Sequence, residues 1–165
     1  MQTGVKACTL ASEDWSDTPE DTMTLLAISF ILLLAAPSDM TPSVVQAPDS
    51  PVRLDRAKIW NGADEPPVLL YAATNVTDEQ MDQFTVIVFI FSAQGRLKAR
   101  QVAPARRTLD ARSTKSSAMV LDGSPIESTD LIVVGVNQAQ RVNSDAWWRA
   151  DLQAAAEEAA RRKKP

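Results

Sequence analysis

The chain contains no histidine and a single cysteine, Cys8, and this limits the chemistry that its side chains can perform. Histidine is the usual general base at neutral pH, so Ser-His-Asp and Cys-His arrangements are excluded. Zinc and copper sites of the ordinary kind also need histidine or cysteine ligands. With five glycines in the whole chain, the sequence shows no glycine-rich loop that could cradle a phosphate. We therefore expect no catalytic residues, no metal site and no cofactor.

Carboxylates are the remaining groups that could take part in catalysis or bind a metal ion. They occur as Asp64-Glu65, as Asp78-Glu79 with Asp82, and as Glu157-Glu158. Such oxygen ligands bind calcium, but the group at 78–82 lacks the dense Asp, Asn and Gly spacing of a dedicated calcium loop. Spacing alone does not exclude a two-carboxylate glycosidase, yet nothing else in the sequence points to one. We interpret the group at 78–82 as a solvated turn.

The strongest local charge lies in residues 96–115, which hold seven cations against the single carboxylate Asp110. Such a segment could face anionic lipid head groups, acidic glycans or nucleic acid. The favoured alternative is an edge strand that outward charges keep soluble and unpaired. Of these ligand classes, nucleic acid has the least support from the sequence, because no aromatic residue interleaves with the charges. The cations are Arg96, Lys98, Arg100, Arg106, Arg107, Arg112 and Lys115.

Residues 1–36 indicate export. The run from Leu25 to Ala36 is apolar or small throughout and is followed by Pro37. A membrane-spanning helix needs about 20 such residues, so the run is short for a span and suits the apolar core of a signal peptide. A short membrane anchor and a buried element of the fold are the alternatives.

The residues before this run are acidic, whereas a signal peptide begins with a positive segment. Residues 1–22 contain Lys6 against five carboxylates, so one interpretation is that translation begins at Met23. Cleavage is expected after Ser38 or after Ala47. The sequence thus predicts an extracytoplasmic protein, periplasmic or secreted, that contacts a membrane only if the N-terminal hydrophobic segment is retained.

Residues 37–51 hold four prolines among serine, threonine and aspartate. Proline lacks a backbone donor, so this range is expected to be a flexible, partly extended linker. The folded domain is expected to span residues 52–140. A C-terminal helix is expected at residues 143–162.

The core of the expected domain is the stretch from Phe84 to Ser92, which is apolar at almost every position and rich in β-branched and aromatic residues. This composition predicts a strand buried on both faces near the middle of a sheet. A shift in alternation near Arg56 indicates a bulge in an edge strand. Turn signals recur about every ten residues, as in an antiparallel sandwich. The expected strands are residues 52–60, 68–74, 84–92, 97–102, 116–121 and 131–137.

The hydrophobic period changes near the end of the chain. Asn143 or Ser144 can cap a helix that would run through Trp147-Trp148 to Arg162. The stripe expected to face the domain is Trp148, Leu152, Ala155 and Ala159. The tryptophan pair could contact a partner, but tryptophan at a helix start more often serves as a packing anchor. Asn75-Val76-Thr77 matches a glycosylation sequon, which we interpret as a chance match.

Three stretches together carry a family resemblance: Leu70–Asn75, Val86–Phe91 and Gly95-Arg96-Leu97. They resemble the FxLYD group of small Ig-like domains on exported bacterial proteins. The segment Phe91–Gly95 departs from that pattern by lacking its usual aspartate, and Leu109-Asp110-Ala111 stands in place of a Leu-Pro-Gly corner. The resemblance implies an extracytoplasmic β-sandwich with no catalytic residues.

The expected fold is therefore an all-β, immunoglobulin-like antiparallel sandwich of about seven strands, followed by a C-terminal α-helix. The expected function is that of a non-enzymatic, exported interaction or structural module with an unknown protein or envelope partner. The alternative is an envelope-associated binder of anionic ligands that uses residues 96–115.

Overall fold

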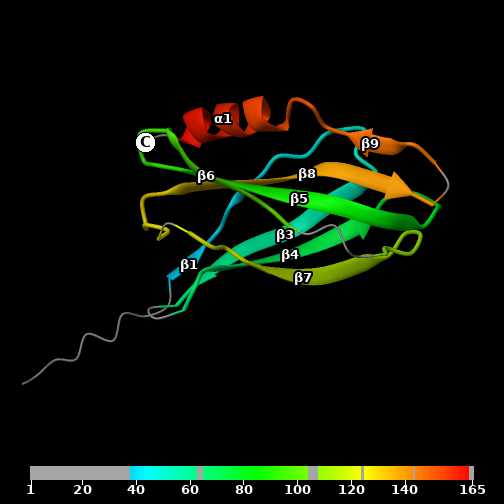
Figure 1. The fold of residues 1–165 in the computed structure, drawn as a ribbon, viewed down its shortest axis with the longest axis horizontal. Helices are drawn as coiled ribbons and strands as arrows, with labels where there is room; N and C mark the ends of the chain where they lie inside the picture. Colours follow the sequence, from blue (N-terminus) through cyan, green and yellow to red (C-terminus); the bar gives the residue numbers. More distant parts are fainter. Residues whose placement is uncertain (1–37, 63–64, 104–107, 124, 143, 164–165) are drawn as a thin grey trace, which may run out of the picture. The chain divides into compact units, whose positions relative to one another are not determined.

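The computed structural model describes residues 38–62, 65–103, 108–123, 125–142 and 144–163 (Figure 1). The signal-like run, Cys8 and Met23 lie outside these residues. The described chain is mostly β, with two packed sheets and one C-terminal helix in a sandwich-like arrangement. Its elements are β1 (Ser38–Met40), β2 (Ser43–Val44), β3 (Val52–Asn61), β4 (Val68–Asn75), β5 (Met81–Phe91), β6 (Leu97–Val102), β7 (Thr114–Val120), β8 (Leu131–Arg141), β9 (Ala146–Trp148) and α1 (Leu152–Lys163).

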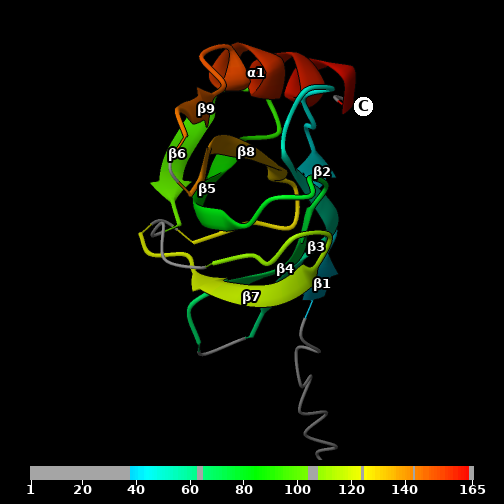
Figure 2. The same ribbon diagram turned by 90° about the vertical axis from the view of Figure 1, so that its right-hand side faces the viewer.

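The strands form two sheets that face each other (Figure 2). The first sheet has the order β1-β3-β4-β7, and the second has the order β2-β8-β5-β6, with β9 also paired to β8. Every pair is antiparallel except β2 with β8, which is parallel, so the expectation of a purely antiparallel sandwich is wrong at this edge. The predicted bulge is confirmed by the register shift between Leu54 and Arg56.

Strand β5 lies between β8 and β6, and this confirms the predicted central strand. Its side chains alternate between two apolar clusters because successive residues of a strand point to opposite faces. Val86, Val88 and Ile90 pack against the first sheet, whereas Phe89 and Phe91 pack beneath α1. All eight residues from Phe84 to Phe91 are buried, which is why this run shows no polar alternation.

The helix begins later than expected. Residues 146–148 form β9, which pairs with Gln138–Gln140 of β8, and α1 starts at Leu152. Two adjacent tryptophans favour an extended chain, and the free edge of β8 supplies the partner that the sequence did not show. The buried stripe is Leu152, Ala156 and Ala160 instead of the predicted Trp148, Leu152, Ala155 and Ala159.

The seating of α1 depends on Gly135 in β8. A Cβ added at this residue would lie 2.6 Å from Leu152 Cδ1 and 2.9 Å from the carbonyl oxygen of Val45. Only a residue without a side chain lets the helix and the chain before β3 approach the sheet this closely.

Residues 37–51 differ from the expected linker. Strands β1 and β2 lie in this range, one in each sheet. The side-chain amide of Gln46 hydrogen-bonds to the backbone of β3 as a neighbouring strand would. Its Nε2 donates to the carbonyl of Val52, and its Oε1 accepts the N–H of Leu54. Pro42 and Pro51 are buried, so these prolines pack in the domain.

Candidate binding cleft at the open edge of the sandwich

The structure does not gather the predicted cations into one surface. Arg96, Lys98 and Arg100 lie before or along β6 in the second sheet. Lys115 lies in β7 of the first sheet, where its Nζ donates to the carbonyl of Thr108. Arg106 and Arg107 lie outside the described residues.

The side chain of Arg112 holds a turn of the fold through hydrogen bonds. It has a φ of 55°, and its Nε and Nη2 donate to the two carboxylate oxygens of Asp78 at 2.8 and 3.1 Å, while Nη1 donates to the carbonyl of Val76. The hydrogen bonds and charge of Arg112 hold the pKa of Asp78 below its ordinary value. This cation therefore joins two loops of the fold.

Lys98 is similarly engaged. Its Nζ lies 2.7 Å from Oδ2 of Asp130, whose side chain is 1% exposed, and 3.4 Å from Oε1 of Glu127. The hydrogen bond to Asp130, with the charges of both carboxylates, raises the pKa of Lys98. Among the described cations of residues 96–115, the side chains of Arg96 and Arg100 are exposed and make no hydrogen bond or ion pair within the described chain. Strand β6 is the edge of the second sheet, the position at which outward charges discourage further pairing.

The tryptophan pair is divided between two roles. Trp147 packs against the core between the sheets, and its Nε1 donates to Oδ2 of Asp49 at 2.9 Å. Trp148 is 61% exposed. The expectation that both residues anchor a helix start is wrong, because they alternate across β9 and point to opposite sides of this strand.

The sequon asparagine is a structural hub. Asn75 is fully buried, and its Nδ2 donates to the carbonyls of Glu79, Leu109 and Asp110 at 2.7, 3.2 and 3.2 Å. Its Oδ1 accepts from the backbone N–H and the hydroxyl of Thr77. Every hydrogen-bonding group of the amide is used, so the side chain is not accessible for modification in the folded domain.

Three of the carboxylates singled out in the sequence pair with arginines. Asp78 and Glu79 pair with arginines, and Glu158 pairs with Arg161 and Arg162, which lower its pKa. Within the described residues, no group of three acidic, cysteine or histidine side chains is placed to hold a metal ion. Asp64 lies outside the described residues. No helix in the described ranges has the length and apolar character needed to cross a membrane.

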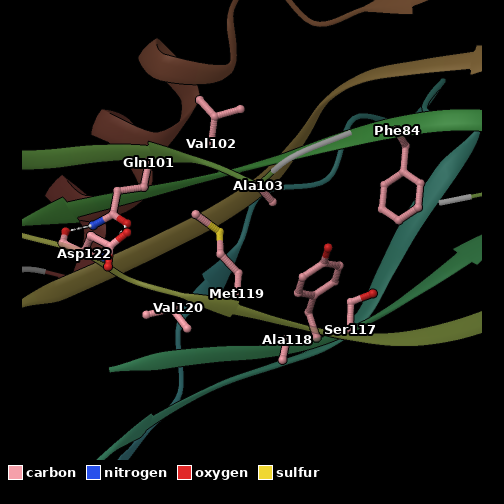
Figure 3. A pocket seen from close by; sticks show the side chains of 10 residues that line it. Phe84, Gln101, Val102, Ala103, Ser117, Ala118, Met119, Val120 and Asp122 are labelled. Carbon is pink, nitrogen blue, oxygen red and sulfur yellow. Dashed lines mark hydrogen bonds between the residues drawn. The ribbon is translucent and has the colours of Figure 1, made fainter. Parts of the chain in front are cut away.

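A hollow of the described surface lies where the two sheets present open edges to each other. Strand β6 ends the second sheet and β7 ends the first, and the cleft between them has a volume of about 700 Å³. Figure 3 shows Phe84 entering it from β5 and Met119 rising from β7. Its walls also include Tyr71, Val102 and Ala103. The surface is a mixture of apolar and uncharged polar groups apart from Asp122.

At one end of the cleft, the side chain of Gln101 pairs with the backbone of Asp122 as a neighbouring strand would. Gln101 donates from Nε2 to the carbonyl of Asp122 and accepts the N–H of Asp122 on Oε1 at 3.0 Å (Figure 3). This reciprocal pair joins β6 to the residues after β7. The rest of the β7 edge has no paired strand among the described residues.

A second, shallower hollow of about 580 Å³ lies on the outer face of the first sheet. The register places Leu70 between Lys58 and Ala118, and Ala72 between Arg56 and Ser116. Leu70 is 44% exposed, so β4, although apolar in sequence, is not buried on both faces. The small side chains of Ser116 and Ala118 in β7 line one side of this hollow, and Arg56 and Lys58 of β3 line the opposite side.

Neither hollow is predicted by the sequence. The signal available was the composition of residues 116–120, Ser-Ser-Ala-Met-Val, which has β character but carries no charge. A strand of this kind at a sheet edge lacks the usual protection against pairing. That β7 lies at an edge, however, follows only from the order of the strands.

The comparisons with known proteins add no identity. No family model matches the chain, and no curated protein matches it.

Proposed function

We propose that this protein is a non-enzymatic, exported, immunoglobulin-like sandwich that acts as an interaction module. The observation that carries the proposal is the open β6–β7 edge, where a cleft is lined by apolar and neutral polar side chains. Its one carboxylate, Asp122, belongs to a residue whose backbone is held by Gln101. Such a surface suits recognition by shape and hydrogen bonding, since a catalytic site needs reactive groups in mutual reach.

Export is supported by the run from Leu25 to Ala36, and the contacts at the start of the domain limit where cleavage can occur. Val45 donates its N–H to the carbonyl of Val134, and its carbonyl accepts from Nη1 of Arg149. Gln46 completes the edge of β3. Cleavage after Ala47 would remove β1, β2 and these contacts, so we place the mature N-terminus at or before residue 39.

The experiment is to express the full chain in a bacterium, fractionate the cells and sequence the N-terminus of the protein recovered from each fraction. We expect an extracytoplasmic product that begins at or before residue 39. A cytoplasmic product that keeps residues 1–36 would refute export, and a stable product that begins at Pro48 would refute the role of β1 and β2.

A second candidate function is binding of an anionic ligand at the cell envelope. Arg96 and Arg100 favour it, because both are exposed beside β6, whereas Lys98 and Arg112 are held by carboxylates. The test is co-sedimentation with vesicles that contain anionic lipid, at low and physiological salt. Binding that is lost in Arg96→Glu with Arg100→Glu, but kept in Arg53→Glu, would support this candidate; equal binding by both variants would refute it.

A further inference from the structure

The edge of β7 offers backbone groups to a further strand. Ser113 accepts the N–H of Asn75, and Leu121 donates to the carbonyl of Pro67, so the odd-numbered residues of this stretch face β4. In an antiparallel ladder the intervening residues direct N–H and C=O to the other side. Ser116, Ala118 and Val120 therefore present their backbone groups away from the sheet, where the described chain supplies no partner strand.

The other edges of the two sheets are protected. Strand β6 carries Lys98 and Arg100, β3 is completed by Gln46 at one end and by β1 at the other, with a bulge between them, and β2 and β9 are only two and three residues long. Charges, bulges and short strands are the devices that prevent edge pairing. Strand β7 has seven residues and one charge, Lys115.

The two hollows lie on either side of this edge with the spacing that a strand requires. Ser117 and Met119 are the less exposed residues of β7 and line the cleft between the sheets together with Ala118 and Val120. Ser116, Ser117 and Ala118 line the outer hollow. A strand added to β7 would send alternate side chains to these two faces. One set of side chains would enter the cleft beside Met119, and the other would lie over the small residues of the outer hollow.

Charge defines the chemistry of the added strand. The cation Arg56 lines the outer hollow, and no acidic residue of the described chain does. The cleft offers the apolar groups of Phe84 and Met119 near its base. A second copy of β7 would not match these requirements, because Thr114–Val120 contains no carboxylate and one lysine.

We infer that β7 docks an extended segment of a partner protein in which apolar residues alternate with acidic ones. The segment adds a fifth strand to the four-stranded first sheet, with its apolar side chains in the cleft and its carboxylates over the outer hollow. This inference rests on the proposed function, because it names the class of partner that the interaction module recognises.

The probe is a synthetic peptide of alternating valine and glutamate, roughly eight residues long, the length of an ordinary strand. Titration into the full-length mature protein is followed by amide chemical shifts and hydrogen exchange. We expect new protection at the amides of Ser116, Ala118 and Val120. A peptide of alternating valine and lysine should bind at least about 10-fold more weakly, which corresponds to about 1.4 kcal/mol.

Two variant pairs decide the location. Ser116→Pro removes an outward N–H from the edge strand, which folded sheets tolerate at this position, and should weaken the valine–glutamate peptide by at least about 10-fold. Ser116→Thr keeps the N–H and should bind normally. Because Ser116→Pro could disturb the fold, Arg56→Gln is tested against Arg53→Gln; only Arg56→Gln should reduce the preference for glutamate over lysine.

Several outcomes would overturn the inference. These are equal binding by Ser116→Pro and Ser116→Thr with both folded, no preference for glutamate, or no binding at millimolar peptide. A concentration-dependent dimer that Ser116→Pro dissociates would instead assign the edge to a second copy. Photo-crosslinking from residue 116 and from residue 148 separates the two proposals. A partner crosslinked only from 148 overturns the docking strand but keeps the interaction module, whereas a partner crosslinked from neither position overturns the module itself.

Discussion

Asn75 offers a sharp test of the structure, because its buried amide satisfies five hydrogen-bonding groups in two loops. Asn75→Asp preserves the shape of the side chain but replaces the donating NH₂ group with an oxygen. That oxygen would face the carbonyls of Glu79, Leu109 and Asp110, the first at 2.7 Å. Acceptors would then oppose acceptors in a site without solvent.

The magnitude follows from the cost of leaving buried polar groups unsatisfied, about 1–3 kcal/mol each. Three carbonyls lose their donor, so we expect Asn75→Asp to lower the free energy of unfolding at pH 7 by about 4 kcal/mol or more. A domain of this kind has about 5–15 kcal/mol in total. Asn75→Ala should cost somewhat less, because it introduces no charge into the site.

The pH dependence gives an independent signature. Burial beside three carbonyls would raise the pKa of the introduced carboxyl above its value in the unfolded chain. The penalty is therefore largest above the folded-state pKa and shrinks as the pH falls and the carboxyl becomes protonated. Asn75→Asp should lose stability from pH 5 to pH 7 relative to Asn75→Ala, the direction opposite to acid denaturation.

The assay is urea unfolding followed by tryptophan fluorescence across this pH range, with Asn137→Asp on the half-buried part of β8 as the control. Asn137→Asp should remain within about 1 kcal/mol of the parent. If Asn75→Asp unfolds at the same urea concentration as Asn137→Asp at pH 7, the buried network does not exist as described and the reasoning fails.

Three further predictions address other contacts. Gly135→Ala should lower stability by about 1–3 kcal/mol through overpacking, and a double-mutant cycle with Leu152→Ala in urea unfolding should give a less than additive loss, since the methyl group meets Leu152 Cδ1; strict additivity would contradict this contact. The pKa of Asp78 is lowered by Arg112, so this pair contributes stability above the ordinary aspartate pKa of about 4 and loses it as the pH falls further; thermal unfolding of Arg112→Gln should therefore approach that of the parent below pH 4, and a difference that stays constant with pH would refute the pairing. Asp130→Ala removes the buried partner of Lys98 and should lower the free energy of unfolding by about 2 kcal/mol, whereas Glu127→Ala, whose side chain is 70% exposed, should change it by less than about 0.5 kcal/mol.

Local composition was enough to predict the central elements of the fold. The β-branched and aromatic run at Phe84–Phe91 identified the middle strand, because a strand covered by a sheet on one side and a helix on the other is apolar on both faces. The bulge near Arg56 was visible as a shift of alternation for the same reason. These features depend on neighbours along the chain, which a sequence shows directly.

Features that depend on distant pairing were not predictable in this way. The prolines of residues 37–51 indicated a linker, yet Gln46 bonds to β3 and Val45 bonds to β8. Trp147 and Trp148 fitted a helical stripe, but the free edge of β8 holds them extended. The candidate cleft arises because β6 and β7 end their sheets, and strand order is not written in any single segment.

The most direct test of the central claim is amide hydrogen exchange of the free, full-length mature protein. The account predicts that the amides of Ser116, Ala118 and Val120 exchange nearly as fast as in an unfolded chain, because they point away from the sheet. The amides of Val86, Val88 and Ile90 in β5 should exchange only through global unfolding. Protection of the three β7 amides to the level of β5 would show that this edge is already covered, and would contradict the open docking strand.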